Sequence, residues 1–176
     1  MLRRRDEIPS SQAILKSKWV FKRKEDLDKA RLVIKGYADK NFYDTMDVYV
    51  PVARLTDVRF LLIIANKYGL EIHQCDIGTA YLNGILLKKV FMELPEGHKD
   101  YKNLHHTYVC ELQKALYGLK VSGRTWYERF RSTMLKLNGR LGKGQTSFSL
   151  FTWDNKLWVA LHRTKVRAWN VTLTHP

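Results

Sequence analysis

The sequence is short of acidic residues, of cysteine and of long apolar runs. Its 176 residues hold 17 Asp and Glu against 31 Lys and Arg. The only cysteines are Cys75 and Cys110, too few for a disulfide framework and not spaced like zinc ligands. The longest apolar run, 60–65, is far too short to cross a bilayer. No apolar stretch follows the basic N-terminus, as a secretory signal would require. These absences predict an intracellular protein, cytoplasmic or nuclear, with no membrane partner.

What the chain does contain is enough apolar material for a core, together with a strong positive charge. Hydrophobic residues make up 45% of the chain and aromatic residues 12%, which excludes general disorder. The formal net charge of +14 favours a polyanionic partner, either nucleic acid or an anionic surface. The alternative is a lysine-rich surface that is simply solvated.

Hydrophobic periodicity predicts a mixture of strands and helices without strict βαβ alternation, so the expected fold class is α+β with an antiparallel sheet. Two main helices are expected, one from Thr56 to Gly69 and one from Ser122 to Gly139. The first is expected to bury Val58, Leu61, Leu62 and Ala65, and the second Trp126, Tyr127, Phe130, Met134 and Leu137. A short helical turn is expected over 78–84. Strands are predicted over 18–24, 29–37, 70–77, 89–95 and 107–112, with a hairpin over 148–161 that turns about Asp154-Asn155.

The remaining segments carry weaker signals. Residues 1–17 are polar and basic and are expected to form a loosely ordered lead-in. Residues 25–28 read as a turn between the first two strands, and 38–53 as an irregular segment containing Pro51. Residues 162–176 show no clean period.

Three features could carry chemistry. Asp76 stands where a strand ends, and there it could bind a hard cation or cap the following turn. The hairpin over 18–37 could clamp phosphates or present a solvated face. The segment 116–127 could approach a nucleic-acid backbone or simply lead into an aromatic helix. The hairpin cations expected to share a face are Lys22, Lys24, Arg31 and Lys35.

Eight blocks in order strengthen the functional alternatives. They are "KWVFKRK", "KARLVIKGY", "YVPVARLTDVRFLL", "HQCDIGTAYLNG", "VFMELPEG", "ELQKALYGLK", "RTWYERF" and "SLF". Together they resemble the reverse transcriptase domain of Ty1/copia-type LTR retrotransposon polyproteins over residues 18–161. The resemblance implies part of a right-hand polymerase, with fingers over 18–53 and the first part of the palm over 54–161. Residues 1–17 would precede this domain, and 162–176 form an unmatched tail.

The resemblance also implies roles for individual residues. Asp76 would be the catalytic aspartate that bridges two Mg²⁺ ions, with the carbonyl of Ile77 as a further metal ligand. Tyr81 would exclude a ribose 2′-hydroxyl from the nucleotide site. Lys29 and Arg31 would hold the triphosphate of the incoming dNTP. The segment beneath the nucleotide and the template would contain Tyr117, Gly118 and Lys120. The implied partners are an RNA template, a DNA primer and dNTP.

One part of the family pattern is missing. The family places an Asp-Asp pair after the strand that "LWVAL" (157–161) resembles, but this sequence continues "HRTKVRAWN". Phosphoryl transfer through two Mg²⁺ ions needs several carboxylates, so a lone Asp76 should bind Mg²⁺ weakly or not at all. Smaller departures are Val121 in place of Gln, Gly123 in place of Pro and Ser147 in place of Asp.

The sequence therefore predicts a fragment of a retrotransposon RNA-directed DNA polymerase that is inactive by itself. A non-catalytic remnant that still binds nucleic acid is the alternative. A decayed copy with no present role is a third interpretation, and the missing Asp-Asp pair ranks it slightly above the binding remnant.

Overall fold

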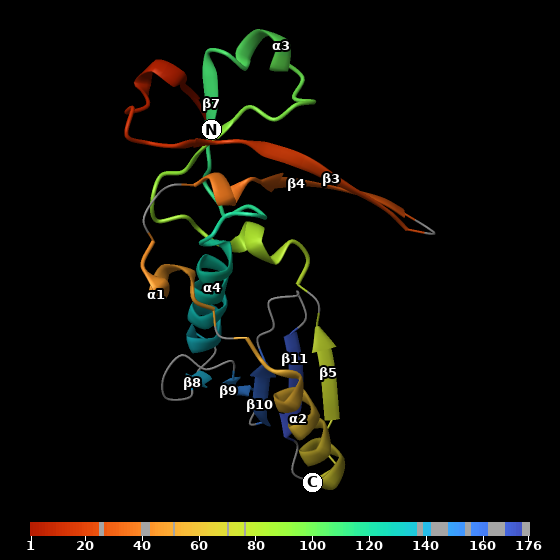
Figure 1. Cartoon of the computed structure of the whole chain (residues 1–176). Helices are drawn as coiled ribbons and strands as arrows, with labels where there is room; N and C mark the ends of the chain where they lie inside the picture. Colours follow the sequence, from red (N-terminus) through yellow and green to blue (C-terminus); the bar gives the residue numbers. More distant parts are fainter. Residues whose placement is uncertain are drawn as a thin grey trace. The chain divides into compact units, whose positions relative to one another are not determined.

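The computed structural model describes residues 1–24, 27–39, 43–50, 52–69, 71–75, 77–136, 139–141, 148–153, 156–161 and 168–173. It has the expected α+β class (Figure 1). The chain divides into two compact units. The first comprises Met1–Val48 with Tyr81–Trp126, and the second comprises Tyr49–Ala80 with Tyr127–Pro176. In the described part of the chain, no helix has the length and apolar character needed to cross a bilayer.

A four-stranded sheet supports the first unit, in the order β1-β7-β6-β2. Its strands are β1 (Leu2–Arg4), β7 (Tyr108–Glu111), β6 (Phe91–Glu93) and β2 (Ile14–Leu15). Neighbours are antiparallel except for β2 and β6, which run parallel. The strands predicted over 89–95 and 107–112 are confirmed in shortened form. The single turn of helix α3 (Tyr101–Leu104) lies in the connection between β6 and β7.

The expectation of a loosely ordered lead-in over 1–17 is wrong, because β1, the 3-10 helix η1 (Arg5–Glu7) and β2 form there. Backbone pairing with β7 holds β1 in place, and an ion pair strengthens the contact. The Nε–H of Arg3 donates to Oε2 of Glu111 at 2.6 Å, and only 8% of Glu111 is exposed. An arginine three residues from the chain start offers no sequence signal for such a distant partner.

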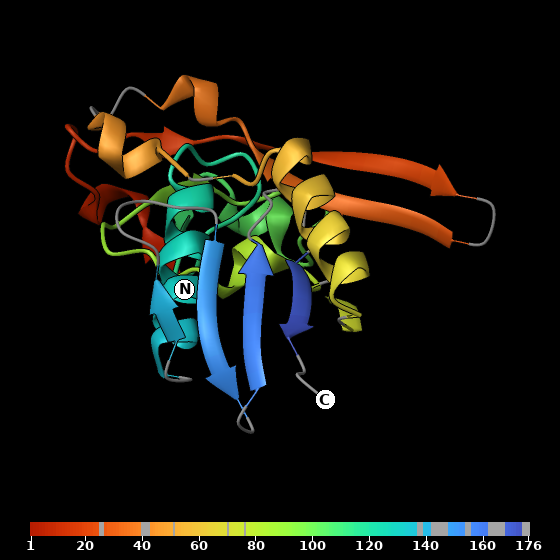
Figure 2. The same ribbon diagram turned by 90° about the horizontal axis from the view of Figure 1, so that it is seen from below.

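The predicted basic hairpin is confirmed as β3 (Ser17–Lys24) and β4 (Leu27–Ile34). It projects from the rest of the first unit in both ribbon views (Figures 1 and 2). Of the turn predicted over 25–28, Leu27 and Asp28 belong to β4, and the other two residues lie outside the described part. After β4 come the 3-10 helix η2 (Gly36–Ala38) and the one-turn helix α1 (Thr45–Val48), so 38–53 is less irregular than expected.

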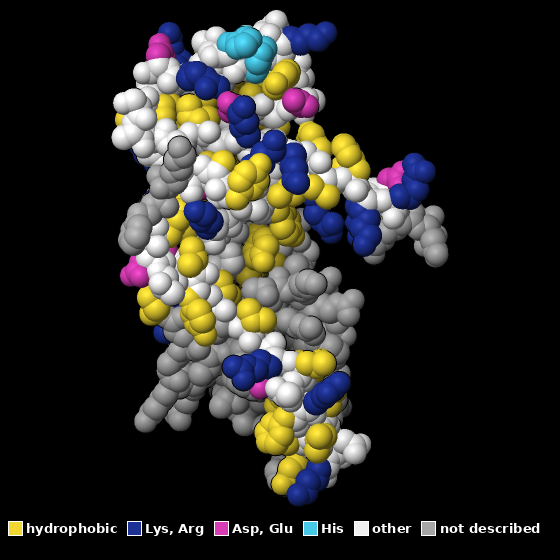
Figure 3. Space-filling model, viewed as in Figure 1, with side chains coloured by type: hydrophobic (Ala, Val, Ile, Leu, Met, Phe, Trp, Pro, Cys, Tyr) yellow, Lys and Arg dark blue, Asp and Glu magenta, His cyan; other side chains and the backbone are white. Residues whose placement is uncertain are grey.

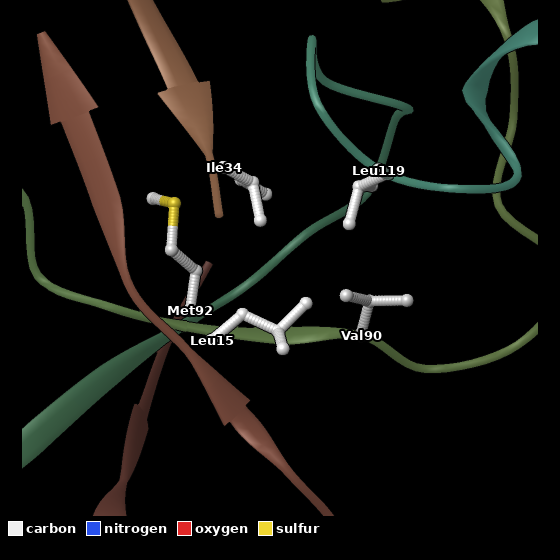
Figure 4. Close-up of a cluster of buried hydrophobic side chains, with 5 residues drawn as sticks. All are labelled: Leu15, Ile34, Val90, Met92 and Leu119. Carbon is white, nitrogen blue, oxygen red and sulfur yellow. The ribbon is translucent and has the colours of Figure 1, made fainter. Parts of the chain in front are cut away.

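The core of the first unit is a cluster of buried side chains from segments far apart in the sequence. The cluster joins β2, the end of β4, the start of β6 and the loop before α4 (Figure 4). Its members are Leu15, Ile34, Val90, Met92 and Leu119, each at most 6% exposed. Burying aliphatic side chains of this size stabilises the fold by about 1.5–3 kcal/mol each. The cluster therefore anchors the base of the hairpin.

In the second unit, a five-stranded antiparallel sheet has the order β5-β11-β10-β9-β8. The predicted hairpin over 148–161 is confirmed as β9 (Phe148–Trp153) and β10 (Lys156–Leu161), although its expected turn at 154–155 lies outside the described residues. Unexpectedly, β11 (Ala168–Leu173) forms within the segment 162–176 and pairs with both β10 and β5 (Glu71–Cys75). The edge strand β8 (Gly139–Leu141) pairs with β9.

Both long helices form where the sequence predicts them. Helix α2 (Leu55–Lys67) contacts β11 and buries Val58, Leu61 and Ala65, while Leu62 remains 38% exposed. Its N-cap is Arg54 rather than Thr56, because the carboxylate of Asp57 accepts a hydrogen bond from the Arg54 backbone at 2.8 Å. The helix ends before Gly69, whose φ is +62°.

Helix α4 (Ser122–Lys136) starts at the predicted residue and buries Trp126, Tyr127 and Phe130. Met134 is half-buried, and Leu137 lies outside the described part. Gly139 belongs to β8, so it does not end the helix. The predicted turn at 78–84 is the 3-10 helix η3 (Ala80–Asn83).

Two glycines allow the end of β4 to meet the loop before α4. Gly118 has φ +94°, and a Cβ built there would collide with the carbonyl oxygen of Ile34. A Cβ at Gly36 would collide in turn with the carbonyl oxygen of Gly118. Just before this contact on both segments, the backbone N–H of Ile34 donates to the carbonyl oxygen of Tyr117 at 2.8 Å. Backbones approach this closely only where side chains are absent.

Gly118→Ala is expected to lower the free energy of unfolding by about 2 kcal/mol or more, because backbone strain adds to a collision that no rotamer relieves. Gly97→Ala is the matched control, since Gly97 also has a left-handed φ of +87° but an added Cβ comes no closer than 4.0 Å to another atom. It should lose only about 1–2 kcal/mol. Equal losses in denaturant unfolding of the two variants would contradict the close backbone approach.

A second prediction concerns pH. The hydrogen bond from Arg3 holds the pKa of the Glu111 carboxyl below its usual range. The stability that this pair contributes is therefore fully present above the ordinary glutamate pKa and is lost as the pH falls through the lowered one. Melting temperatures of the wild-type and Glu111→Gln chains should differ at neutral pH and converge in acid. The exposed Glu96→Gln control should follow the wild type, and a constant difference down to acid pH would contradict the ion pair.

Candidate nucleic-acid interface

The residues singled out from the sequence fall into two groups. Six belong to the first unit and are described, namely Lys29, Arg31, Tyr81, Tyr117, Gly118 and Lys120. The proposed metal ligands belong to the second unit. Asp76 lies outside the described residues, and the half-buried Ile77 follows it.

The pairing of β3 with β4 gathers cations on one face of the hairpin. Lys22 is directly opposite Lys29, and Val20 is opposite Arg31. Residues that oppose each other in an antiparallel pair share a face, with Cβ atoms about 4.5–5.5 Å apart. Lys18, opposite Val33, extends the same row. We call Lys18, Lys22, Lys29 and Arg31 the basic face, and Lys and Arg side chains along the projecting hairpin are visible in Figure 3.

The prediction that Lys22 and Arg31 share a face of the hairpin is confirmed, and the strand pairing adds Lys29 and Lys18 to that face. Lys35 lies beyond the end of β4, and the side chain of Lys24 is outside the described part. Among the described residues, the four cations of the basic face form no ion pair with an acidic side chain. Their positive charge is therefore available to an external anion.

The opposite face of the hairpin has a different character. Trp19 and Phe21 stack with ring centroids 6.4 Å apart, and the indole N–H of Trp19 donates to the carbonyl oxygen of Glu96 at 2.8 Å. Toward the tip, Arg23 pairs with Asp28 across the strands at 3.3 Å. The one described cation on this face is thus neutralised by a neighbour, whereas those on the basic face are not.

Two tyrosines from distant segments meet in the first unit. The rings of Tyr81, in η3, and Tyr117, before α4, pack edge to face with centroids 5.0 Å apart. Such a pair contributes about 0.5–1.5 kcal/mol beyond the area it buries. Burial is the main cause that raises the pKa of the Tyr81 hydroxyl, and the neighbouring Tyr117 adds to it. Tyr81 therefore keeps its proton at neutral pH and can donate a hydrogen bond.

The tyrosine pair and the basic hairpin are tied together through backbone. Tyr117 accepts the hydrogen bond from Ile34, the last residue of β4, and Gly118 packs on the same stretch. Two residues further on, the Lys120 ammonium donates to the carbonyl oxygen of Asp39 at 2.7 Å. The resemblance placed Gly118 beneath the nucleotide, but no local sequence signal predicted that it meets Gly36. Asp39 was not singled out from the sequence as a site residue. Its burial, with only 2% of the residue exposed, becomes apparent only in the structure.

In the second unit, the sheet aligns the end of β5 with the end of β10 and the start of β11. Cys75, the last residue of β5, opposes Ala168 at the start of β11, and Leu161 at the end of β10 opposes Trp169. The end of β5, which precedes Asp76, therefore lies on the same side of the sheet as the end of β10 and the start of β11, which residues 162–167 join. That connection reads His-Arg-Thr-Lys-Val-Arg, with no carboxylate. Within the described residues, no group of three His, Cys, Asp or Glu side chains could hold a metal ion.

Comparison with known proteins matches this chain to one family. The family model for reverse transcriptase (RNA-dependent DNA polymerase) matches residues 5–166. The Retrovirus-related Pol polyprotein from transposon TNT 1-94 of Nicotiana tabacum is 42% identical over 134 residues, which are 73% of this chain and 10% of that protein. The Pol polyprotein from transposon RE1 of Arabidopsis thaliana is 38% identical over 137 residues, 73% of this chain and 9% of that protein.

A yeast relative is more distant. The Transposon Ty1-BL Gag-Pol polyprotein of Saccharomyces cerevisiae is 32% identical over 133 residues, 72% of this chain and 7% of that protein. The chain thus spans a tenth or less of the length of these relatives. No solved structure matches it. The ordered motifs and the family match over 5–166 agree, and the chain belongs to the reverse transcriptase family, in the group found in Ty1/copia-type retrotransposon Pol polyproteins.

Proposed function

We propose that this chain is the nucleic-acid-gripping part of a retrotransposon reverse transcriptase and that it does not polymerise by itself. Residues 18–53 would serve as fingers and 54–161 as the first part of the palm of a right-hand polymerase. The observation that carries the proposal is the direct opposition of Lys22 and Lys29 within a row of cations that has no acidic partner among the described residues.

Placing like charges directly opposite each other on a two-stranded ribbon destabilises the free protein. A ribbon of this kind gains nothing structurally from such a pair, since either position would tolerate a neutral side chain. A polyanion removes the repulsion and releases counterions as it binds. The arrangement is thus unfavourable for the isolated fold and favourable for a complex with a phosphate backbone, which is typical of a binding surface.

The family resemblance adds an assignment within this surface. Without dNTP, Arg31 and Lys29 would contact the nucleic-acid backbone with the rest of the basic face. When dNTP is bound, they would contact its triphosphate, where a guanidinium can bind phosphate oxygens through two hydrogen bonds. Tyr81, held by Tyr117, would form the wall beside the sugar and exclude a 2′-hydroxyl. Gly118 would let the backbone approach the bound strand. The tie between Ile34 and Tyr117 supports these assignments, because it fixes β4 relative to the tyrosines.

Catalysis is a different matter, because the family uses Mg²⁺ and this chain supplies too few ligands for it. Asp76 would offer one carboxylate, and Ile77 a carbonyl. The stretch that joins β10 to β11 would have to provide the rest, and it contains Arg163, Lys165 and Arg167 instead of acids. Mg²⁺ holds its water shell tightly and needs several oxygen ligands in octahedral geometry. The residues present do not fit a two-metal centre, so we infer no chemical step through it.

The basic face predicts binding that depends steeply on salt. A fluorescein-labelled RNA–DNA primer–template should bind at low salt, with the logarithm of the association constant falling linearly with the logarithm of salt concentration. Lys29→Met and Arg31→Met should each weaken binding and reduce that slope by about one, since each removes one phosphate contact. Fluorescence anisotropy titrations at several salt concentrations measure both quantities.

The same hairpin provides the control. Arg23→Met removes an equal charge from the opposite face, where Asp28 already pairs with it. Its affinity and slope should remain close to those of the wild type. If Arg23→Met reduces the slope as much as Lys29→Met, the binding is diffuse and the basic face is not the interface. If no complex forms at low salt, the binding function itself is wrong.

The missing carboxylates predict that the chain lacks polymerase activity. A homopolymer template with an annealed primer, dNTP and Mg²⁺ should show no primer extension above background, whether position 76 is Asp or Ala. Mn²⁺ in place of Mg²⁺ tests whether a less demanding ion rescues activity, and none is expected. Extension by the wild-type chain that Asp76→Ala abolishes would show that the chain assembles a working metal centre.

A further inference from the structure

Lys120 is engaged by groups of the protein itself, unlike the cations of the basic face. Its Nζ donates to the carbonyl oxygen of Asp39 at 2.7 Å and lies 5.8 Å from the centroid of the Tyr43 ring. The hydroxyl of Tyr43 donates in turn to Oδ2 of Asp39. Lys120, Tyr43 and the buried Asp39 thus contact one another in pairs.

These contacts continue a series along two aligned segments. Ile34 bonds to Tyr117, and Gly36 packs on Gly118. Asp39 with Lys120 is the third contact, and each lies further along both segments than the one before. The series connects the exit of β4 with the loop before α4. The first two contacts are made by backbone, and only the third is made by a side chain.

We propose that Lys120 is a positioning residue that fixes the base of the β3–β4 hairpin onto the segment carrying Tyr117, rather than a ligand of bound phosphates. The inference rests on the proposed binding function and deepens it. An ammonium held by a carbonyl oxygen and an aromatic ring has its position set before any ligand arrives. The hairpin is thereby held at one angle to the tyrosine pair, so the basic face needs less ordering when it binds.

The salt dependence of binding separates the two roles. Lys120→Met should weaken binding of the labelled primer–template about threefold to tenfold at fixed salt, while the slope against salt stays at the wild-type value. A phosphate ligand would instead lower the slope by about one, as Lys29→Met is expected to do. Lys120→Arg should restore most of the affinity, because a guanidinium can also donate to Asp39 and stack on Tyr43.

Amide hydrogen exchange tests the contact without nucleic acid. Exchange at Ile34, Ala38 and Asp39 should accelerate at least fivefold in Lys120→Met. The third contact holds both the bond from Ile34 to Tyr117 and the turn in which Ala38 and Asp39 donate to Lys35 and Gly36. The amide of Arg5, whose partner is the Thr107 carbonyl in the sheet region, should be unchanged. Tyr43→Leu, which leaves Lys120 in place but removes the ring and hydroxyl, should accelerate the same amides and also weaken binding without changing the slope.

Each result decides the inference. It is wrong if Lys120→Met lowers the slope, if affinity is unchanged while the wild type binds, or if exchange at Ile34, Ala38 and Asp39 does not accelerate. A wild-type chain that binds no nucleic acid refutes the proposed function, and the exchange measurement then decides alone whether Lys120 holds the hairpin base.

Discussion

The close approach of two backbones at Gly36 and Gly118 is the constraint on which the first unit depends. Neither position tolerates a Cβ, and the hydrogen bond from Ile34 to Tyr117 lies next to this approach along both segments. Through this contact, a hairpin that would be marginal as an isolated two-stranded ribbon gains a fixed base. The apolar cluster around Ile34 and Leu119 buries the same junction.

Charge then distinguishes the two faces of the hairpin. Arg23 and Asp28 neutralise each other on one face, while Lys22 and Lys29 repel each other on the other. The strands that carry Lys22 and Lys29 stay paired despite this repulsion only because the core holds the base of the hairpin in place. In the second unit, the stretch of sequence that joins β10 to β11 contains Arg163, Lys165 and Arg167 and no acidic residue.

The sequence predicted elements and ancestry well and tertiary contacts poorly. Periodicity located both long helices and the hairpins, because burial of one face leaves a regular pattern. Residues 1–17 and 162–176 lacked such a pattern, yet β1 and β11 form there through pairing with distant strands. The contact between Asp39 and Lys120 spans 81 residues and has no local signature. Motif order named Lys120 as a site residue, but only its contacts suggest what it does.

Lysine footprinting tests the central claim most directly, because it reads individual ammonium groups of the intact chain. Acetylation of the chain with and without saturating primer–template, followed by mass spectrometry, gives the protection of each lysine. The account predicts strong protection of Lys18, Lys22 and Lys29, and little at the exposed Lys99 and Lys102. Protection spread evenly over all five, or absent from the hairpin while the complex forms, would contradict it.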